Sequence, residues 1–153
     1  MKKENGAEDA IKILKSDHKK VKDAFKEYEQ LGEKAFSSKK KLADKICAEL
    51  TIHTQVEEEI FYPLFRQKLP KEKPLVNEAA VEHASAKELI SQIQSMSGDD
   101  PLFDAKVKVL SEYINHHVRE EEKEMFPLMR NADVDLNEVG SLIMERKQQL
   151  QSA

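Results

Sequence analysis

The chain has 153 residues, enough for one domain with a buried core and too few for two comfortable domains. Its 39% hydrophobic and 35% charged residues suit amphipathic helices, and only four glycines and five prolines argue against an all-β protein, which needs many more turns. The formal net charge is −4, and the lysine run at residues 39–41 is better explained by a solvated helix face than by a nucleic-acid patch.

Apolar residues at helical spacing predict a first helix over residues 7–31 and a second from about residue 38 to 68. Gly32 is expected to end the first helix, and the serines that follow offer a cap for the second. Cys47 is the single cysteine, so it excludes an internal disulfide and a zinc-thiolate cluster and is expected to be a small core residue. The inward positions are Ile11, Leu14, Val21 and Phe25 in the first helix, and Leu42, Ile46, Leu50, Ile60 and Leu64 in the second.

A third helix is predicted to end near Met96, after a proline-containing connection over residues 69–74. A turn at residues 97–101 leads to a fourth helix that continues to about Arg130, and a short helix over residues 136–149 closes the chain. The inward positions are Val76, Ala80, Ile90 and Ile93 in the third helix, and Phe103, Leu110, Ile114 and Leu128 in the fourth.

Four long helices with short links predict an all-α fold, an up-down-up-down four-helix bundle with a short extra C-terminal helix. We expect the bundle domain over residues 7–131. Residues 132–153 are expected to pack on the bundle or extend it.

The sequence contains an internal repeat: residues 53–63 read HTQVEEEIFYP, and residues 117–127 read HVREEEKEMFP. Histidine, two glutamates, an aromatic residue and proline recur at the same five offsets. Pro63 and Pro127 each remove one helix hydrogen bond and are expected to kink or end their helices near the same level. The second and fourth helices are therefore predicted to be equivalent elements.

Each repeat places a glutamate four residues after a histidine, which puts both side chains on one helix face. His53 with Glu57 shares its face with the apolar stripe of the second helix, and His117 with Glu121 shares that of the fourth. Both pairs are therefore predicted to point into the core. His18 and His83 lie at helical spacing from the apolar residues of the first and third helices, so each of the four helices supplies one inward histidine.

Two carboxylates and four imidazoles in one core are costly without a compensating charge, and metal ions remove that cost. Imidazole and carboxylate without thiolate suit iron, manganese or zinc. Six protein ligands exceed what one tetrahedral zinc requires. Two bridging carboxylates and two imidazoles per metal would serve two ions, with an oxo or hydroxo bridge, solvent and an open position completing the shell.

In the order of these ligands the sequence resembles the hemerythrin-like, HHE-type cation-binding domains, a family of four-helix bundles with a non-haem di-iron centre. The family motif places histidine on the first helix, His-x-x-x-Glu on the second, histidine on the third, and His-x-x-x-Glu or Asp on the fourth. The resemblance covers roughly residues 7–131 and implies two irons bridged by Glu57 and Glu121. The matching positions are Asp17-His18, His53 with Glu57, His83, and His117 with Glu121. The resemblance further implies that His18 and His53 bind one iron and that His83 and His117 bind the other.

One departure concerns the third helix, where oxygen-carrying hemerythrins have two histidines one turn apart. The positions four residues from His83 are Ala79 and Lys87, so the site is one histidine short. This disfavours reversible oxygen transport and favours a more open site. Tyr113, one turn before His117, is expected to be a packed core tyrosine, with a role beside the metals as the alternative.

His116 also begins a His-x-x-x-Glu pair, with Glu120, but it shares its face with Lys123 and is expected to be exposed. The repeat alignment favours His117 as the ligand. Asp17 is expected either to orient a ligand or to lie at the surface. The remaining glutamates of the repeats, Glu58, Glu59 and Glu122, are expected to be solvated or to lie just outside the ligands.

Three functions stay open at this point. The chain is a di-iron protein that binds or senses oxygen, peroxide, nitric oxide or iron, a catalase-like or peroxidase-like enzyme that consumes peroxide, or a metal-free helical interaction module. No segment approaches the ~18 apolar residues of a membrane span, and no leader cleavage signature is seen, so a cytoplasmic protein is expected. We expect no nucleic-acid or membrane partner, and a monomer or weak dimer.

Overall fold

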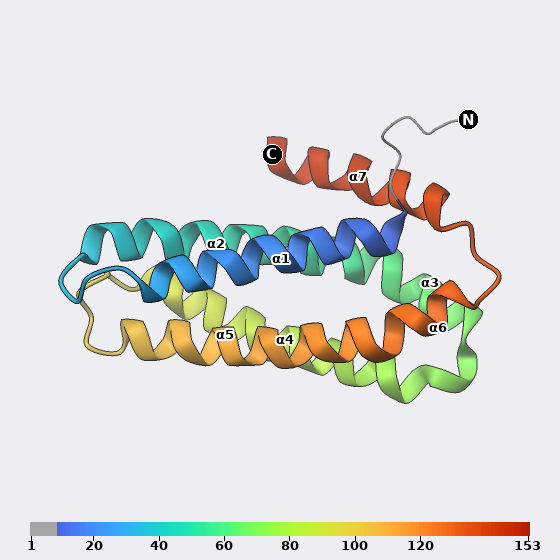
Figure 1. Cartoon of the computed structure of the whole chain (residues 1–153), viewed down its shortest axis with the longest axis horizontal. Helices are drawn as coiled ribbons and strands as arrows, with labels where there is room; N and C mark the ends of the chain where they lie inside the picture. The colour runs from blue at the N-terminus through green and yellow to red at the C-terminus, as the bar shows by residue number, and fades with distance from the viewer. Residues whose placement is uncertain (1–8) are drawn as a thin grey trace.

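The computed structural model describes residues 9–153, so the predicted helix and domain start at residue 7 lies outside the described residues. Four long helical segments lie side by side and alternate in direction, and a further helix lies across the outside of the bundle (Figure 1). The elements are α1 (Ala10–Glu29), α2 (Phe36–Val56), η1 (Glu57–Phe61), α3 (Tyr62–Lys68), η2 (Pro70–Glu72), α4 (Lys73–Ser95), α5 (Phe103–Glu120), η3 (Glu121–Met125), α6 (Phe126–Arg130) and α7 (Leu136–Ser152). The predicted all-α bundle with an extra C-terminal helix is confirmed. Within this described part, no helix is long and apolar enough to cross a membrane.

Local side-chain chemistry sets several helix ends. Asp9 caps α1 by accepting from the backbone N–H of Lys12 at 2.8 Å, and Asp135 caps α7 in the same way. Each such cap satisfies an N–H group that has no partner inside its helix and contributes about 1 kcal/mol. The turn between α4 and α5 contains Gly98, where any Cβ would collide with the carbonyl oxygen of Phe36. Glycine therefore lets this turn approach the start of α2.

The prolines of the repeat act through π-helical turns. In η1 the N–H of Tyr62 bonds to the carbonyl of Glu57, five residues back, and in η3 Phe126 bonds to Glu121 in the same way. Each π-turn accommodates one extra residue directly before the proline, so both helices are perturbed at the same level but neither ends there.

The extra residue also changes which side chains face inward after each π-turn. The predicted inward residues Ile60 and Leu64 are only half-buried, whereas Phe61 and Phe65 are fully buried. The same shift of one position occurs in the second repeat, where Met125 and Met129 are buried and Leu128 is half-buried. The inward stripe predicted for a regular helix is therefore wrong beyond the π-turns.

The apolar core forms two clusters with a polar layer between them. One cluster surrounds Leu14, Phe61 and Phe126 and includes Ile143 of α7, while the other surrounds Phe25, Ile46 and related residues and includes the buried Cys47. Burial and the nearby charge of Asp44 raise the pKa of the Cys47 thiol to about 12. In each of the four long segments, the inward histidine falls between residues of the two clusters. The fold thus sets one layer of polar side chains between two apolar layers.

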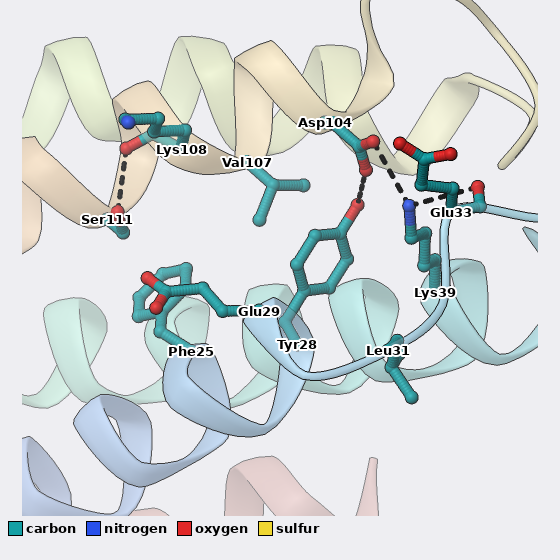
Figure 2. Close-up of a pocket in the computed structure, with 10 residues that line it drawn as sticks. All are labelled: Phe25, Tyr28, Glu29, Leu31, Glu33, Lys39, Asp104, Val107, Lys108 and Ser111. Atoms are coloured by element: carbon teal, nitrogen blue, oxygen red, sulfur yellow. Dashed lines mark hydrogen bonds and ion pairs between the residues drawn. The ribbon is translucent and has the colours of Figure 1, made fainter. Parts of the chain in front are cut away.

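A second polar group lies far from that layer, at the end of the bundle where α1 passes into α2. Asp104 accepts from the hydroxyl of Tyr28 at 2.6 Å and from the ammonium of buried Lys39 at 3.1 Å, and Lys39 also bonds to the carbonyl of Glu33 (Figure 2). These groups line a pocket of about 430 Å³ together with Phe25 and other residues. Because the polar atoms bond to one another across three segments, we interpret this group as a closure of the bundle end.

Candidate metal centre

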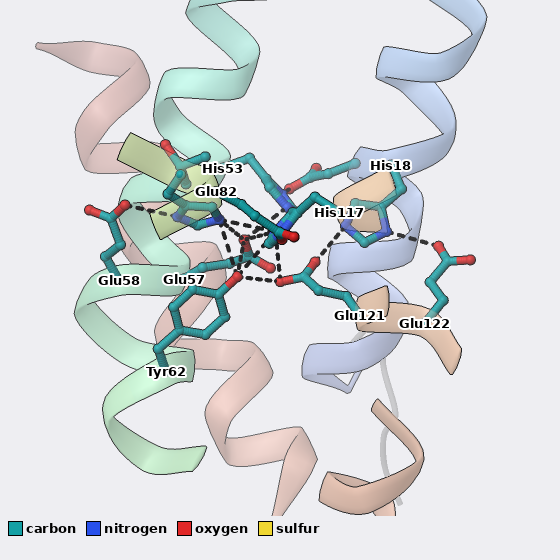
Figure 3. Close-up of polar contacts among 12 residues, drawn as sticks. His18, His53, Glu57, Glu58, Tyr62, Glu82, His117, Glu121 and Glu122 are labelled. Atoms are coloured by element: carbon teal, nitrogen blue, oxygen red, sulfur yellow. Dashed lines mark hydrogen bonds and ion pairs between the residues drawn. The ribbon is translucent and has the colours of Figure 1, made fainter. Parts of the chain in front are cut away.

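Six polar side chains from the four long segments converge in the layer between the two apolar clusters (Figure 3). They are His18 of α1, His53 of α2, Glu57 of η1, His83 of α4, His117 of α5 and Glu121 of η3. None is more than 5% exposed, and both glutamates are fully buried. The structure therefore brings together all six residues that the sequence pattern singled out as ligands.

The six residues form two sets of four donors that share both glutamates. Glu57 and Glu121 approach His18 and His53 in one set, and His83 and His117 in the other, with all donor atoms of a set within 4.8 Å of one another. The Nε2 atom of His18 lies 3.0 Å from Glu121, and that of His83 lies 3.1 Å from Glu57. The two sets thus have the composition of a two-cation site with shared carboxylates.

The imidazole rings are held from behind by a second ring of carboxylates. Each Nδ1 atom bonds to one acidic side chain: His18 to Glu122 at 2.8 Å, His53 to Asp17 at 2.9 Å, His83 to Glu58 at 2.8 Å and His117 to Glu82 at 2.8 Å. In a neutral imidazole whose Nδ1–H donates to a carboxylate, the Nε2 atom carries a lone pair that points to the centre. This arrangement fixes the tautomer and orientation of histidines that ligate metals.

Burial and charge act against each other at the centre. Although burial lowers the pKa of His53, the charge of Glu57 and the hydrogen bond to Asp17 raise it to about 10. Burial raises the pKa of Glu57, but the charge of His53 and hydrogen bonds hold it well below its usual range. In the metal-free protein, a proton on the His53 imidazole therefore compensates the charge of the buried Glu57 carboxylate.

The donor atoms fit cations better than they fit one another. Within residues 9–153, the buried atoms His53 Nε2 and Glu57 Oε2 have no hydrogen-bond partner. His53 Nε2 lies 3.4 Å from the other Glu57 oxygen, close enough for charge attraction but not with hydrogen-bond geometry. The Nε2 atoms of His83 and His117 lie 3.1 Å apart. Ring nitrogens that lie this close together, and buried polar atoms without a partner, are what a cation between them would satisfy.

Tyr62 also lies at the centre, and it was not singled out from the sequence. Its buried hydroxyl donates to Glu121 at 2.5 Å and lies 3.1 Å from the Nε2 atom of His117 (Figure 3). The Nε2 atom of His83 lies at the same distance from this hydroxyl. Burial and the charges of Glu57 and Glu121 raise the pKa of this phenol well above its usual value. The repeat held the signal, because Tyr62 is the counterpart of Phe126 at the same offset from the histidine.

The expectation for Tyr113 is wrong, because its side chain is 46% exposed. His117 already lies at the edge of the inward stripe of α5, and a residue four positions earlier lies about 40° further round the helix, toward solvent. His116 is exposed as expected and contacts Glu82 and Glu120 at 3.3 Å each. A hydrogen bond with Glu82 is the chief cause that raises the pKa of Glu120 to about 8.

The residues that hold the histidines were only partly anticipated. Of the two roles expected for Asp17, the structure shows contact with a ligand residue, because Asp17 bonds to His53. Glu58 and Glu122 also each bond to a histidine. Glu59 instead bonds to Arg146 of α7. Glu82 was not singled out, although it precedes His83 just as Asp17 precedes His18. In the sequence, each of the four carboxylates that bond to the histidines is adjacent to one of the six converging residues, and this adjacency could have predicted them.

Fold and site together define a helical bundle of the cation-binding type, with an interior set of histidines and glutamates. The chain belongs to the family described as hemerythrin HHE cation binding domain, whose sequence model matches residues 9–129. A crystal structure of a hemerythrin HHE cation binding domain-containing protein from Mycobacterium kansasii is similar to it with a TM-score of 0.80 and 21% identity, over 95% of this chain and 88% of that one.

Two curated proteins are also similar to the chain. One is a DNA nickase of Nostoc sp., 30% identical over 119 residues, which are 78% of this chain and 33% of the relative. The other is a hemerythrin-like protein of Schizosaccharomyces pombe, 26% identical over 129 residues, which are 84% of this chain and 61% of the relative. The chain thus spans a third of the first relative and about three fifths of the second.

Proposed function

We propose that the chain is a non-haem di-iron protein whose centre binds or reacts with oxygen, peroxide or nitric oxide. The observation that carries the proposal is the convergence of four buried imidazoles on two shared, fully buried carboxylates. In this proposal His18 and His53 hold one ion, His83 and His117 hold the other, and Glu57 and Glu121 bridge them. The bundle domain of residues 7–131 carries the site, and residues 132–153 pack on it.

Nitrogen and oxygen ligands without thiolate favour iron over softer metals, with manganese and zinc as alternatives. Two irons held here would supply one-electron redox chemistry and a position open to a small ligand. The protein's own contribution is to aim four Nε2 atoms inward, to share two carboxylates and to exclude bulk water with the apolar clusters on either side.

The number of metal ions bound per chain tests the proposal. If the protein binds metal, the hypothesis of a metal-free helical interaction module is excluded. Protein stripped with a chelator and reloaded anaerobically with ferrous ion should hold about two ions per chain, because uptake is linked to the folded site. His116→Ala, next to a proposed ligand but exposed, is the matched control and should hold the same amount. Less than about a tenth of an ion per wild-type chain would refute the proposal.

A second candidate function, peroxide consumption, is favoured by Tyr62. Its hydroxyl lies beside His83 and His117, and it is the one phenol at the centre among the described residues. A hydroxyl at that place can hold a peroxide oxygen by donating one hydrogen bond to it. Binding alone does not need such a donor.

Steady peroxide consumption by iron-loaded protein separates an enzyme from a binding or sensing protein. We expect consumption to be abolished in Glu121→Ala and slowed in Tyr62→Phe, with metal content retained in the latter. Turnover that is absent from fully loaded wild-type protein would leave binding or sensing as the function. We propose no DNA-directed role, because the chain spans only 33% of the nickase relative and carries a net charge of −4.

A further inference from the structure

The C-terminal helix α7 reaches the centre through one chain of polar contacts. The ammonium of Lys147 donates to Asp17 Oδ1 at 2.5 Å, and the other oxygen of Asp17 accepts from His53 Nδ1 at 2.9 Å. One turn of α7 away from Lys147 is Ile143, which is fully buried in an apolar cluster of the bundle. The position of Lys147 is therefore fixed by packing, and two hydrogen bonds connect it to an imidazole of the centre.

Within residues 9–153, none of the other three carboxylates behind the histidines has such a partner from outside the bundle. Glu58 meets Lys87, where the two side chains are 33% and 49% exposed, and Glu82 meets His116, which is 60% exposed. Asp17 and Lys147 are only 12% and 14% exposed. Exposed ion pairs hold their members weakly, whereas a mostly buried pair is screened less and orients its members more firmly.

A second contact from α7 reaches the same half of the site. Arg146 donates from Nε and Nη2 to the two oxygens of Glu59 at 2.7 and 3.2 Å. Glu59 lies in η1, the π-turn that carries Glu57. This pair docks α7 on the π-turn but touches neither Asp17 nor a histidine, so it separates docking of the helix from orientation of His53.

We propose that Lys147 is a positioning residue for the metal subsite formed by His18 and His53, and that α7 is for this reason a functional part of the centre. The ammonium holds one oxygen of Asp17 so that the other stays in line with His53 Nδ1. Without it, Asp17 is free to turn into solvent, and the His53 ring loses the contact that aims its Nε2 atom inward. The inference rests on the proposed function, namely on two ions at the centre.

Ferrous-ion affinity, measured anaerobically by competition with a chelator, tests the inference in Lys147→Met. We expect one of the two ions to bind about 10- to 100-fold more weakly and the other to bind as in wild type, because loss of a group behind a ligand typically has this effect. Lys147→Arg, which keeps a positively charged donor, should retain most of the wild-type affinity. Lys87→Met removes the lysine behind His83 and should change affinity less, because that pair is exposed.

Arg146→Met controls for docking of α7 and should leave both affinities unchanged. Equal weakening of both ions in Lys147→Met, unchanged binding of both, or the same selective loss in Arg146→Met would each overturn the inference. Lys147→Gln, which keeps a donor without a charge, carries the same prediction if the methionine variant does not fold. Wild-type protein that takes up no metal would instead refute the proposed function, so the two failures are distinguishable.

Discussion

The two halves of the centre have the same ligands but different surroundings. Residues of α1, α2 and η1 form one half, residues of α4, α5 and η3 form the other, and each half presents two histidines and one buried glutamate. The carboxylates that bond to the histidines also correspond in the two halves. Asp17 accepts from His53, and Glu82 accepts from His117 at the matching position. The bundle therefore repeats one ligand arrangement around an approximate two-fold axis.

The aromatic residue before each proline breaks this symmetry. Phe126 stacks on His18 with ring centroids 5.8 Å apart, whereas Tyr62 directs its hydroxyl at His83 and His117. One proposed subsite is thus closed by an apolar ring and the other by a hydrogen-bonding group. The difference indicates that a duplicated ligand set can serve two unequal positions, with small-ligand chemistry expected on the Tyr62 side.

The largest effect is expected from replacement of a glutamate that belongs to both donor sets. Glu57→Ala should lose both ions, because Glu57 belongs to both donor sets. Its loss also leaves the His53 charge without its buried partner, and breaking such a pair costs about 3–5 kcal/mol of unfolding free energy. Elemental analysis and denaturant unfolding of the metal-free protein measure the two effects. Retention of one tightly bound ion would contradict a shared glutamate.

Changes confined to one half should separate the two subsites. His53→Ala and His117→Ala are each expected to lower the metal content from about two ions per chain toward one, and to weaken metal-linked stabilisation accordingly. Competition titrations on both variants and on the wild type measure the remaining affinities. If either variant lost all metal while the other lost none, the assignment of two histidines to each ion would be wrong.

Replacement of Tyr62 by the phenylalanine found at its counterpart Phe126 tests whether the hydroxyl causes the asymmetry. Tyr62→Phe should retain both metals, because the tyrosine is not among the six ligands, but it should lose about 1–3 kcal/mol of stability in the metal-free protein, where the other buried polar groups lose a partner. Binding of azide or nitric oxide, followed by absorption spectroscopy, should change in Tyr62→Phe and not in the exposed control Tyr113→Phe. Identical spectra in all three proteins would remove Tyr62 from the chemistry.

A further effect concerns pH and the half that contains His53. Its pKa is raised to about 10, so its proton stabilises the metal-free fold fully below the unfolded value of about 6.5, and this stabilisation is lost as the pH rises through about 10. Thermal melting of metal-free protein should therefore show a decline from pH 7 to pH 10 that His53→Ala reduces. Metal uptake near pH 8 should release protons into a weakly buffered solution, and uptake without release would contradict a protonated site.

The sequence predicted most of the fold because its signals are local. Helical spacing of apolar residues gave the long segments, and the repeat identified equivalent elements in two of them. It also identified the six side chains that converge, because residues four apart on a helix share a face whatever the rest of the chain does. His117 was separated from His116 by the repeat alignment and by the residues that share each face, and their burial and exposure agree with it.

Features that depend on the path of the backbone were not predictable in this way. In a regular helix, Tyr62 would lie about half a turn round from His53 and point away from the centre. The π-turn before Pro63 adds a residue and turns Tyr62 inward, just as it moves Phe61 and Phe65 into the core. The prediction for Tyr113 was wrong for the opposite reason. The α5 helix is regular at this position, so Tyr113 lies outside the buried face of the helix.

The sequence by itself determined that two carboxylates and four imidazoles share the interior, because amphipathic spacing and the cost of buried charge act within single helices. Only the tertiary structure decided which acidic residue holds which histidine, since each of these bonds joins different segments. It also decided that α7 reaches Asp17 through Lys147, a contact across 130 positions of sequence that no local pattern encodes.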